Sequence, residues 1–352
     1  MSIDIRNFVN VNIDRNVKLT ISGSRPEVML FSAKSKLTLV GSNSDYTKFY
    51  KEDYSEATVN TSDLPYVKYF FMNGGCKLTL TTDALPTTQS ALEAISNDVI
   101  VLASTATITS TTLALFDKLE GIHQKIFVMR QEATTTAPTS SNFIACKLSS
   151  NAGSEMTIAA YLSQIKFYEN ASPVDYCFTK ESLVINEDKS SDITTDSDTL
   201  IKTPYNFNIK IGDNYYNVGG NTTNGEDLVE QYGLIVMQQD LTTSVFKTLS
   251  TKISGQKGLA AIRTSISEVM DMFVNSGFLT TEKVWTSSDL VLPNKADGTK
   301  PNETIITKNT PISNGYYIHM FKISGDLRKA YAVIIVATNK GIRYVIVDGK
   351  AI

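Results

Sequence analysis

The residues best suited to nucleophilic or metal chemistry are two histidines and three cysteines in a chain of 352 residues. His123 and His319 lie far apart in the sequence, and no nucleophile motif adjoins either of them. Cys76, Cys146 and Cys177 lack C-x-x-C spacing and neighbouring histidines, which disfavours both a zinc site and a disulfide framework. We therefore expect structural histidines, buried thiols in a reducing compartment, and neither catalytic residues nor a metal site.

Short catalytic and phosphate-binding motifs are also missing. The sequence has no G-x-S-x-G, H-E-x-x-H or G-x-x-x-x-G-K-S/T pattern. The Gly-rich stretch at 217–227 could hold an anion at the start of the helix it precedes, but it lacks a lysine and already carries Glu226 and Asp227 there. We interpret it as a turn, and the glycines of 254–258 as a separator between two helices. The sequence thus predicts no cofactor and no enzyme.

One acidic stretch, at 186–199, invites comparison with a calcium loop. It lacks the central Gly and the terminal Glu that an EF-hand loop requires. We expect a solvated surface loop there.

The composition excludes some classes of partner. A formal net charge of -3 and an isoelectric point of about 5.6 give no basic surface for phosphate neutralisation, so nucleic acid is not expected as a partner. The longest apolar run, Ala330 to Ala337, is far shorter than the roughly 20 residues of a membrane-spanning helix. Asp4 and Arg6 stand where a signal peptide would be apolar. We expect neither membrane insertion nor classical secretion.

Strand and helix patterns alternate through the middle of the chain. Strands are expected at 28–31, 36–40, 76–82, 98–104, 125–131, 142–148 and 174–179, and helices at 64–75, 89–96, 112–121 and 155–169. This alternation predicts a layered domain of the βαβ type over roughly residues 80 to 180.

The later part of the chain has a different order. A strand-like stretch at 205–220 precedes two amphipathic helices, from Glu226 to about Lys252 and from Leu259 to Asn275, the second ended by Gly277. Strand patterns follow at 316–323, 332–338 and 342–347. The fold class predicted is therefore α/β plus α+β, in several domains.

Strand-forming stretches also lie near both ends of the sequence. Asn7 to Ile13 alternates apolar and polar residues, and 333–352 contains two β-branched runs with few charges and no proline. Strands of this kind aggregate if an edge stays unpaired. We expect both stretches to be extended arms that complete a sheet.

Several stretches, in this order and spacing, resemble the contractile tail sheath proteins of myovirus-type bacteriophages and related contractile injection systems. They are MSIDIRNFVNVNI, YVKYFFMNGG, IAAYLSQIKFYE before VDYCF, GNTTNGEDLVEQYGLIVMQQDLTTSVFKTLSTK, and GLAAIRTSISEVMDMFVNSGFL followed by the last strands. Together they span most of the chain. The larger inserted domains of long sheath proteins have no counterpart here, so the resemblance implies a compact version.

The resemblance implies a structural subunit that stacks as hexameric rings around a tail tube and contracts. Its domains would be a donor-strand arm at 1–20, part of the core at 21–80, a peripheral α/β domain at 81–195, a tube-proximal α+β domain at 196–330, and C-terminal strands and arm at 331–352. Its partners would be other copies of itself, the tube protein, and baseplate and terminator proteins. It would be located in the virion tail after assembly in the host cytoplasm.

The resemblance also implies which residues join neighbouring subunits. Strand exchange would use Phe8, Val9, Val11 and Ile13 at one end, and Val333, Ile335, Ile342, Tyr344 and Ile346 at the other. The main-chain hydrogen bonds of an added strand would hold subunits together while the linking segments bend. A tube-facing group would consist of Lys247, Lys252, Lys257 and Arg263, for which a solvated helix face is the alternative.

Three other functions stay open at this point. The chain could be another tail or baseplate protein that uses its arms in a fixed joint. It could be a small-molecule binder or enzyme, in which case polar groups after 98–104 or 125–131 should converge in a pocket. It could also be a monomer whose last strands belong to its own sheet.

Overall fold

The computed structural model describes residues 27–32, 34–40, 50–51, 58–96, 99–116, 125–132, 144–165, 167, 176–177, 179–182, 204–251, 255–291, 304–322 and 330–339. They divide into two compact units, and the division falls within helix α6 (Leu228–Ser250). The α/β unit contains the described residues of Ser24–Ile165 and Pro173–Ile235. The hairpin unit contains Phe167 and the described residues of Val236–Lys340. The α/β unit thus includes residues on both sides of the expected 81–195 domain.

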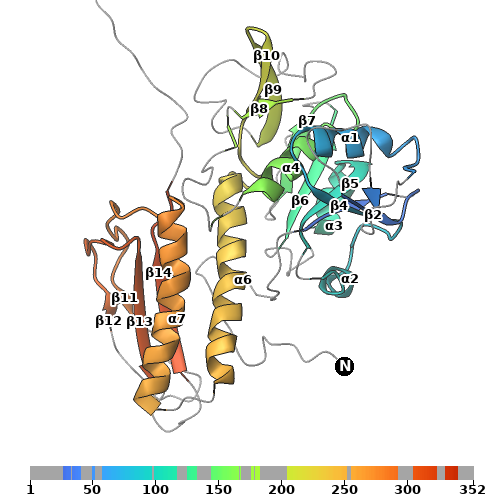
Figure 1. Ribbon diagram of the computed structural model, residues 1–352. Coiled ribbons are helices and arrows are strands. Elements are labelled where there is room, and N and C mark those ends of the chain that lie inside the picture. Colours follow the sequence, from blue (N-terminus) through green and yellow to red (C-terminus); the bar gives the residue numbers. More distant parts are fainter. Residues whose placement is uncertain are drawn as a thin grey trace, which may run out of the picture. The chain divides into compact units, whose positions relative to one another are not determined.

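A ten-stranded mixed sheet forms the centre of the α/β unit (Figure 1). The strand order is β3-β2-β4-β1-β5-β6-β7-β9-β10-β8. Strands β4 to β9 in this order are parallel, and the pairs at both edges are antiparallel. The strands are β1 (Glu27–Phe31), β2 (Leu37–Val40), β3 (Tyr50–Lys51), β4 (Lys77–Thr81), β5 (Val99–Thr107), β6 (Ile126–Gln131), β7 (Ile144–Leu148), β8 (Lys180–Glu181), β9 (Tyr205–Ile211) and β10 (Asn214–Val218).

Helices cover both faces of this sheet, which explains why β5, β6 and β7 are almost continuously apolar. Helices α1 (Leu64–Met72) and α4 (Met156–Gln164) pack against each other, and α4 also contacts β1, β5 and β6. Leu92 of α2 (Gln89–Glu93) and Phe116 of α3 (Ser110–Phe116) join the hydrophobic cluster on the other face. The α/β class expected for this part is confirmed in this general sense.

The side-chain alternation of β6 and β7 determines what lies under α4. Phe127 and Met129 of β6 belong to the cluster with Leu92 and Phe116, as do Ile144, Cys146 and Leu148 of β7. Successive strand residues point to opposite faces. Arg130 on β6 and Lys147 on β7 therefore lie on the opposite face, which is the one that α4 covers.

The hairpin unit contains the later part of α6, α7 (Gly255–Asn275), and two small antiparallel sheets. These are β11 (Leu290–Val291) with β12 (Thr304–Ile306), and β13 (Tyr316–Lys322) with β14 (Ala330–Val336). Phe167, Phe273 and Phe278 form an aromatic cluster with ring centroids 5.0 to 5.7 Å apart. No helix among the described residues is long and apolar enough to cross a membrane.

Three sequence predictions about elements are wrong. Helix α4 ends at Gln164, because Ile165 is extended and Phe167 packs on Phe273 and Phe278. The described residues of 174–179 are not in a strand, and the buried ring of Tyr176 packs beside Tyr161 of α4. Gly258 does not separate two helices, because it lies inside α7, which begins at Gly255.

Candidate functional site

A row of buried polar side chains crosses the sheet beneath α4. Arg130 on β6 is the register partner of Lys147 on β7, which is in turn the partner of Asn206 on β9. Each of these residues is at least nine-tenths buried. We call these three residues, together with the side chains that bind them, the polar row.

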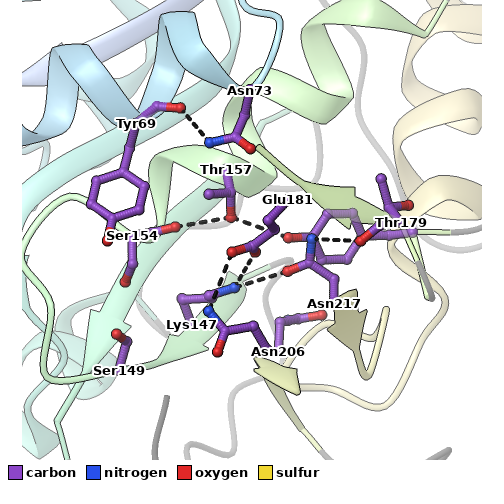
Figure 2. Close-up of polar contacts among 12 residues, drawn as sticks. Tyr69, Asn73, Lys147, Ser149, Ser154, Thr157, Thr179, Glu181, Asn206 and Asn217 are labelled. Carbon is purple, nitrogen blue, oxygen red and sulfur yellow. Dashed lines mark hydrogen bonds and ion pairs between the residues drawn. The ribbon is translucent and has the colours of Figure 1, made fainter. Parts of the chain in front are cut away.

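Lys147 is the most completely bonded charge of the polar row (Figure 2). Its Nζ donates to Glu181 Oε1 at 2.5 Å and to Asn217 Oδ1 at 2.8 Å, and both charged side chains are at most 1% exposed. Asn208 Nδ2 donates to the second oxygen of Glu181 at 3.3 Å. Because Glu181 is on β8 and Asn217 is on β10, the lysine ties the antiparallel edge to the parallel strands.

Asn206 extends the same bonding toward the start of α6. Its side chain donates to the carbonyl oxygens of Cys146 and Asn221, at 3.3 and 3.0 Å, and accepts from Gly220 N at 2.8 Å. Gly219 permits this close approach, since it has φ +109° and a Cβ there would lie 2.3 Å from Tyr205 O. The following residues form the turn expected from the sequence, and Asp227 Oδ1 caps α6 by accepting from Glu230 N at 2.8 Å.

Arg130 is paired less completely than Lys147. Its Nη1 donates to Glu132 Oε1 at 2.8 Å and to Ser149 O at 3.2 Å, whereas its Nε is 3.8 Å from Glu155 Oε2. Glu155 directly precedes α4 and is fully buried. Burial raises the pKa of Glu155 from 4.5 to about 7, against the opposing effects of nearby backbone N–H groups, Arg130 and Lys147.

The starts of α1 and α4 meet near this pair. Gly153, with φ +89°, lies so close to α1 that an added Cβ would be 2.7 Å from Pro65 C and Tyr66 N. Tyr66 donates to Thr105 O at 3.1 Å, and burial, with the charge of Glu155, raises its pKa to about 12. The backbone just before Glu155 is therefore packed closely against the start of α1.

The carboxyl ends of the parallel strands test the small-molecule alternative. In the order β4-β1-β5-β6-β7, connections reverse direction between β1 and β5, where open α/β sheets commonly bind ligands. Polar groups do gather at these ends, and they are buried within the chain. Asp63 precedes α1 and accepts from Ser35 Oγ at 2.6 Å, and Glu155 precedes α4. Two carboxylates thus occupy the helix starts where an anionic ligand would bind.

A pocket of about 550 Å³ lies at the other ends of α1 and α4. Several of its polar groups are bonded to one another: Asn73 Oδ1 accepts from Ser182 N, Gln164 Nε2 donates to Asn73 O, and Thr157 Oγ1 contacts Tyr176 OH. Figure 2 shows Asn73 and Thr157 above the Lys147 cluster. The pocket is lined by Met72, Asn73, Gly74, Thr157, Tyr161, Gln164, Tyr176, Thr179, Lys180, Glu181, Ser182 and Asn217.

The chemistry of these groups favours a structural role over catalysis. Burial strongly raises the pKa of the Cys146 thiol, which keeps it protonated and unreactive. Lys147 is bonded to a carboxylate and an amide, and Glu155 has no exposed surface. Within the described ranges, no three His, Cys, Asp or Glu side chains gather in a way that could hold a metal ion.

The residues predicted for strand exchange and tube contact lie in a different part of the chain. Val333 and Ile335 are in β14, opposite His319 and Tyr317 of β13. Lys247 is exposed on α6, and Lys257 and Arg263 are exposed on α7. The other predicted residues lie outside the described residues: Phe8, Val9, Val11, Ile13, Ile342, Tyr344, Ile346 and Lys252.

The sequence did not single out the polar row. The available signal was one basic residue inside each of two apolar strand patterns, Arg130 in KIFVMRQ and Lys147 in NFIACKL. A charge at such a position is almost never buried without a partner. The partners themselves carry no local signal.

No protein-family model matches this chain, and no curated protein matches it.

Proposed function

We propose that this chain is the structural subunit of a contractile tail sheath of the myovirus type. Copies of it stack as hexameric rings around a tail tube and contract to drive the tube through the host envelope. The stack ends at baseplate and terminator proteins, and it is part of the virion tail. The proposal starts from the resemblance of the sequence, and the observation that carries it is the sheet formed by β13 and β14.

Both faces of this sheet are covered within the hairpin unit. On one face, Ile335 and Val333 pack in a cluster with Ile306, Ile312 and Trp285. On the other face α7 contacts β13, and Tyr316 OH donates to Asp271 Oδ1 at 2.7 Å. The hairpin is therefore held in place by side-chain packing over both surfaces.

The edges of the same sheet differ from its faces. Its two strands pair in register from Tyr316 with Val336 to Lys322 with Ala330. In the described ranges no third strand pairs along either of them, and the residues just after β14 are bridged only at Thr338, to Leu279. A two-stranded sheet is marginal alone, and an open edge is a template for another strand. The strand-patterned arms at 7–13 and 342–347 have the length and alternation to fill such edges. Strands donated between copies would join subunits into a mesh.

The α/β unit suits this role because its buried charges are used for cohesion. Four charged side chains, Arg130, Lys147, Glu155 and Glu181, join strands and helix inside it. In this proposal the α/β unit keeps its internal packing during contraction, and the driving energy is stored when the extended lattice assembles. Such a mechanism requires no nucleotide site.

Electron microscopy of the purified chain tests this proposal. We expect the chain alone to form long striated tubes, and a chain lacking residues 1–13 to stay folded but unpolymerised. A finer test replaces Val9 and Val11 by proline, which removes main-chain donors from the arm. Ser2→Pro is the matched control and should leave the tubes intact.

The alternatives give different images. A baseplate component would form closed assemblies of fixed size instead of long tubes. A monodisperse monomer whose stability is unaltered by the loss of either arm would show that the last strands belong to the chain's own sheet. Tubes that persist without residues 1–13 would disprove strand donation by this arm.

A further inference from the structure

Three asparagines of the sequence are followed directly by glycine, and the structure describes all three pairs. They are Asn73, Asn224 and Asn314. Such a pair can deamidate without an enzyme, because glycine has no side chain that keeps its amide nitrogen away from the asparagine side chain. The three pairs share this sequence signal, so a difference between their reactivities must come largely from the fold.

Deamidation joins the two residues of the pair in a ring. The glycine amide nitrogen attacks the side-chain carbonyl carbon Cγ of asparagine, and the bond from Cγ to Nδ2 breaks. The side-chain nitrogen leaves as ammonia and takes the proton of the glycine N–H. Water from the solvent then opens the succinimide ring at either carbonyl carbon, which gives aspartate or isoaspartate. The asparagine side chain must therefore be free to turn, and solvent must reach it.

The backbones of the three pairs are alike, because the glycine N–H closes a turn in each. Gly74, Gly225 and Gly315 donate to Phe71 O, Thr222 O and Ile312 O, at 3.2, 2.9 and 3.0 Å. Their φ angles are +96°, +81° and +76°. Each reaction thus begins with the loss of one such hydrogen bond, and this step does not distinguish the pairs.

The side chain of Asn73 is the most restrained of the three. Its Nδ2 donates to Tyr69 O at 2.8 Å, and its Oδ1 accepts from Ser182 N at 2.8 Å. The residue is also half-buried. Both ends of the amide must be released before Cγ can meet the nitrogen of Gly74.

Asn224 is exposed, but its side chain is also bonded. Its Oδ1 accepts from Thr222 Oγ1 and, at 3.3 Å, from Glu226 N. With the bond of the Gly225 N–H, three hydrogen bonds must break before the ring can form. Each bond that must break lowers the population of the reactive arrangement several-fold.

Asn314 is exposed, and its side chain makes no hydrogen bond with the described residues. Only the bond from Gly315 N to Ile312 O stands against ring formation there. We propose that Asn314 is the Asn-Gly site at which the folded chain deamidates fastest. This inference does not depend on the proposed sheath function.

The modified residue would lie at the beginning of the β13–β14 hairpin. Gly315 O accepts from Ala337 N at 2.9 Å, and Tyr316 pairs with Val336 directly after it. Isoaspartate carries one more main-chain carbon than asparagine, so it changes the spacing just before this first pair. The reaction therefore adds a negative charge and displaces the backbone where the hairpin begins.

Peptide mass spectrometry of the full chain, incubated in mildly alkaline buffer made with heavy-oxygen water, tests the site. The heavy oxygen marks acids formed during the incubation and excludes those formed during digestion. In the folded chain we expect conversion at Asn314 to be several-fold faster than at Asn224, and conversion at Asn73 to be the slowest. Conversion at Asn224 or Asn73 that is as fast as at Asn314 would overturn the proposal.

The same chain unfolded in guanidinium chloride supplies the reference rates. There the three pairs should react at similar rates, because their hydrogen bonds are lost. If Asn314 leads by the same factor in the unfolded chain, neighbouring residues and not the fold set the order, which would contradict the structural argument.

One variant tests the restraint itself. Thr222→Val removes the hydroxyl that donates to Asn224 Oδ1, so conversion at Asn224 should become several-fold faster while that at Asn314 stays unchanged. Thr264→Val, at an exposed position of α7, is the matched control and should change neither rate. An unchanged rate at Asn224 in a folded Thr222→Val chain would show that side-chain bonding does not set the order. If Thr222→Val does not fold, the comparison of folded and unfolded parent chains decides.

Discussion

The α/β unit contains two buried ion pairs that share one sheet face but are bonded differently. Lys147 and Glu181 are 2.5 Å apart, and amides complete both groups. Arg130 and Glu155 are 3.8 Å apart, and Arg130 is shared with Glu132, whose side chain is 62% exposed. The two cations are register partners on neighbouring strands, so the pairs differ although their cations occupy matching positions in the sheet. The pair of Lys147 and Glu181 acts as a fixed joint, whereas the pair of Arg130 and Glu155 can change its charge with pH.

The largest effect is expected from breaking the direct pair. Lys147→Met leaves Glu181 buried without its cation, which should lower the free energy of unfolding by about 3–5 kcal/mol. Urea denaturation, followed by a probe in the α/β unit, measures this. Lys257→Met, on the exposed face of α7, is the control and should change stability little. A loss no larger than that of the control would show that the pair is not a structural joint.

An intermediate effect is expected from the second pair, and it depends on pH. Burial raises the pKa of Glu155 to about 7 in the folded chain, so the folded state binds a proton that the unfolded state has released. This stabilisation is complete below pH about 4.5 and is lost as pH rises through about 7. Glu155→Gln should remove that slope and be more stable than the parent chain at pH about 8, by an amount on the order of 1–3 kcal/mol.

Denaturation midpoints across this pH range measure the slope. The exposed Glu268 of α7 supplies the control, because Glu268→Gln should leave the slope unchanged. Equal slopes in Glu155→Gln and the parent chain would mean that another group titrates.

Much of the α/β architecture could be predicted from local pattern. The strands β5, β6 and β7 are short apolar runs between turn signals, and such runs form strands when both faces are buried. The end of α4 could not be predicted in this way. The helical pattern continues past Gln164, but Phe167 contributes more by packing on Phe273 and Phe278 than by extending the helix. Tertiary contact overrides local preference there.

The polar row could not be predicted from local pattern either, for a different reason. The partners of Lys147 stand 34 and 70 residues away in the sequence, so their approach depends on strand order. That order places β8 and β10 beside β9, and no local pattern encodes it. Arg130 and Lys147 could have been recognised as charges inside apolar strands, but Glu155 and Glu181 could not have been assigned to them.

The smallest effect on stability, and the sharpest test of the comparison, is expected at Glu132. Its pair with Arg130 is exposed on one side, so Glu132→Gln should change the free energy of unfolding by less than about 1 kcal/mol. Glu132→Gln removes the ion pair between Arg130 and residue 132. The guanidinium of Arg130 can then turn toward Glu155. The ionised form of Glu155 would then be favoured, and its pKa should fall. The pH at which stability is lost should therefore move to lower values, while the slope stays that of one proton. If that pH is the same in Glu132→Gln and the parent chain, then Glu132 and Glu155 do not compete for Arg130. The difference between the Arg130–Glu155 and Lys147–Glu181 pairs would then need another explanation.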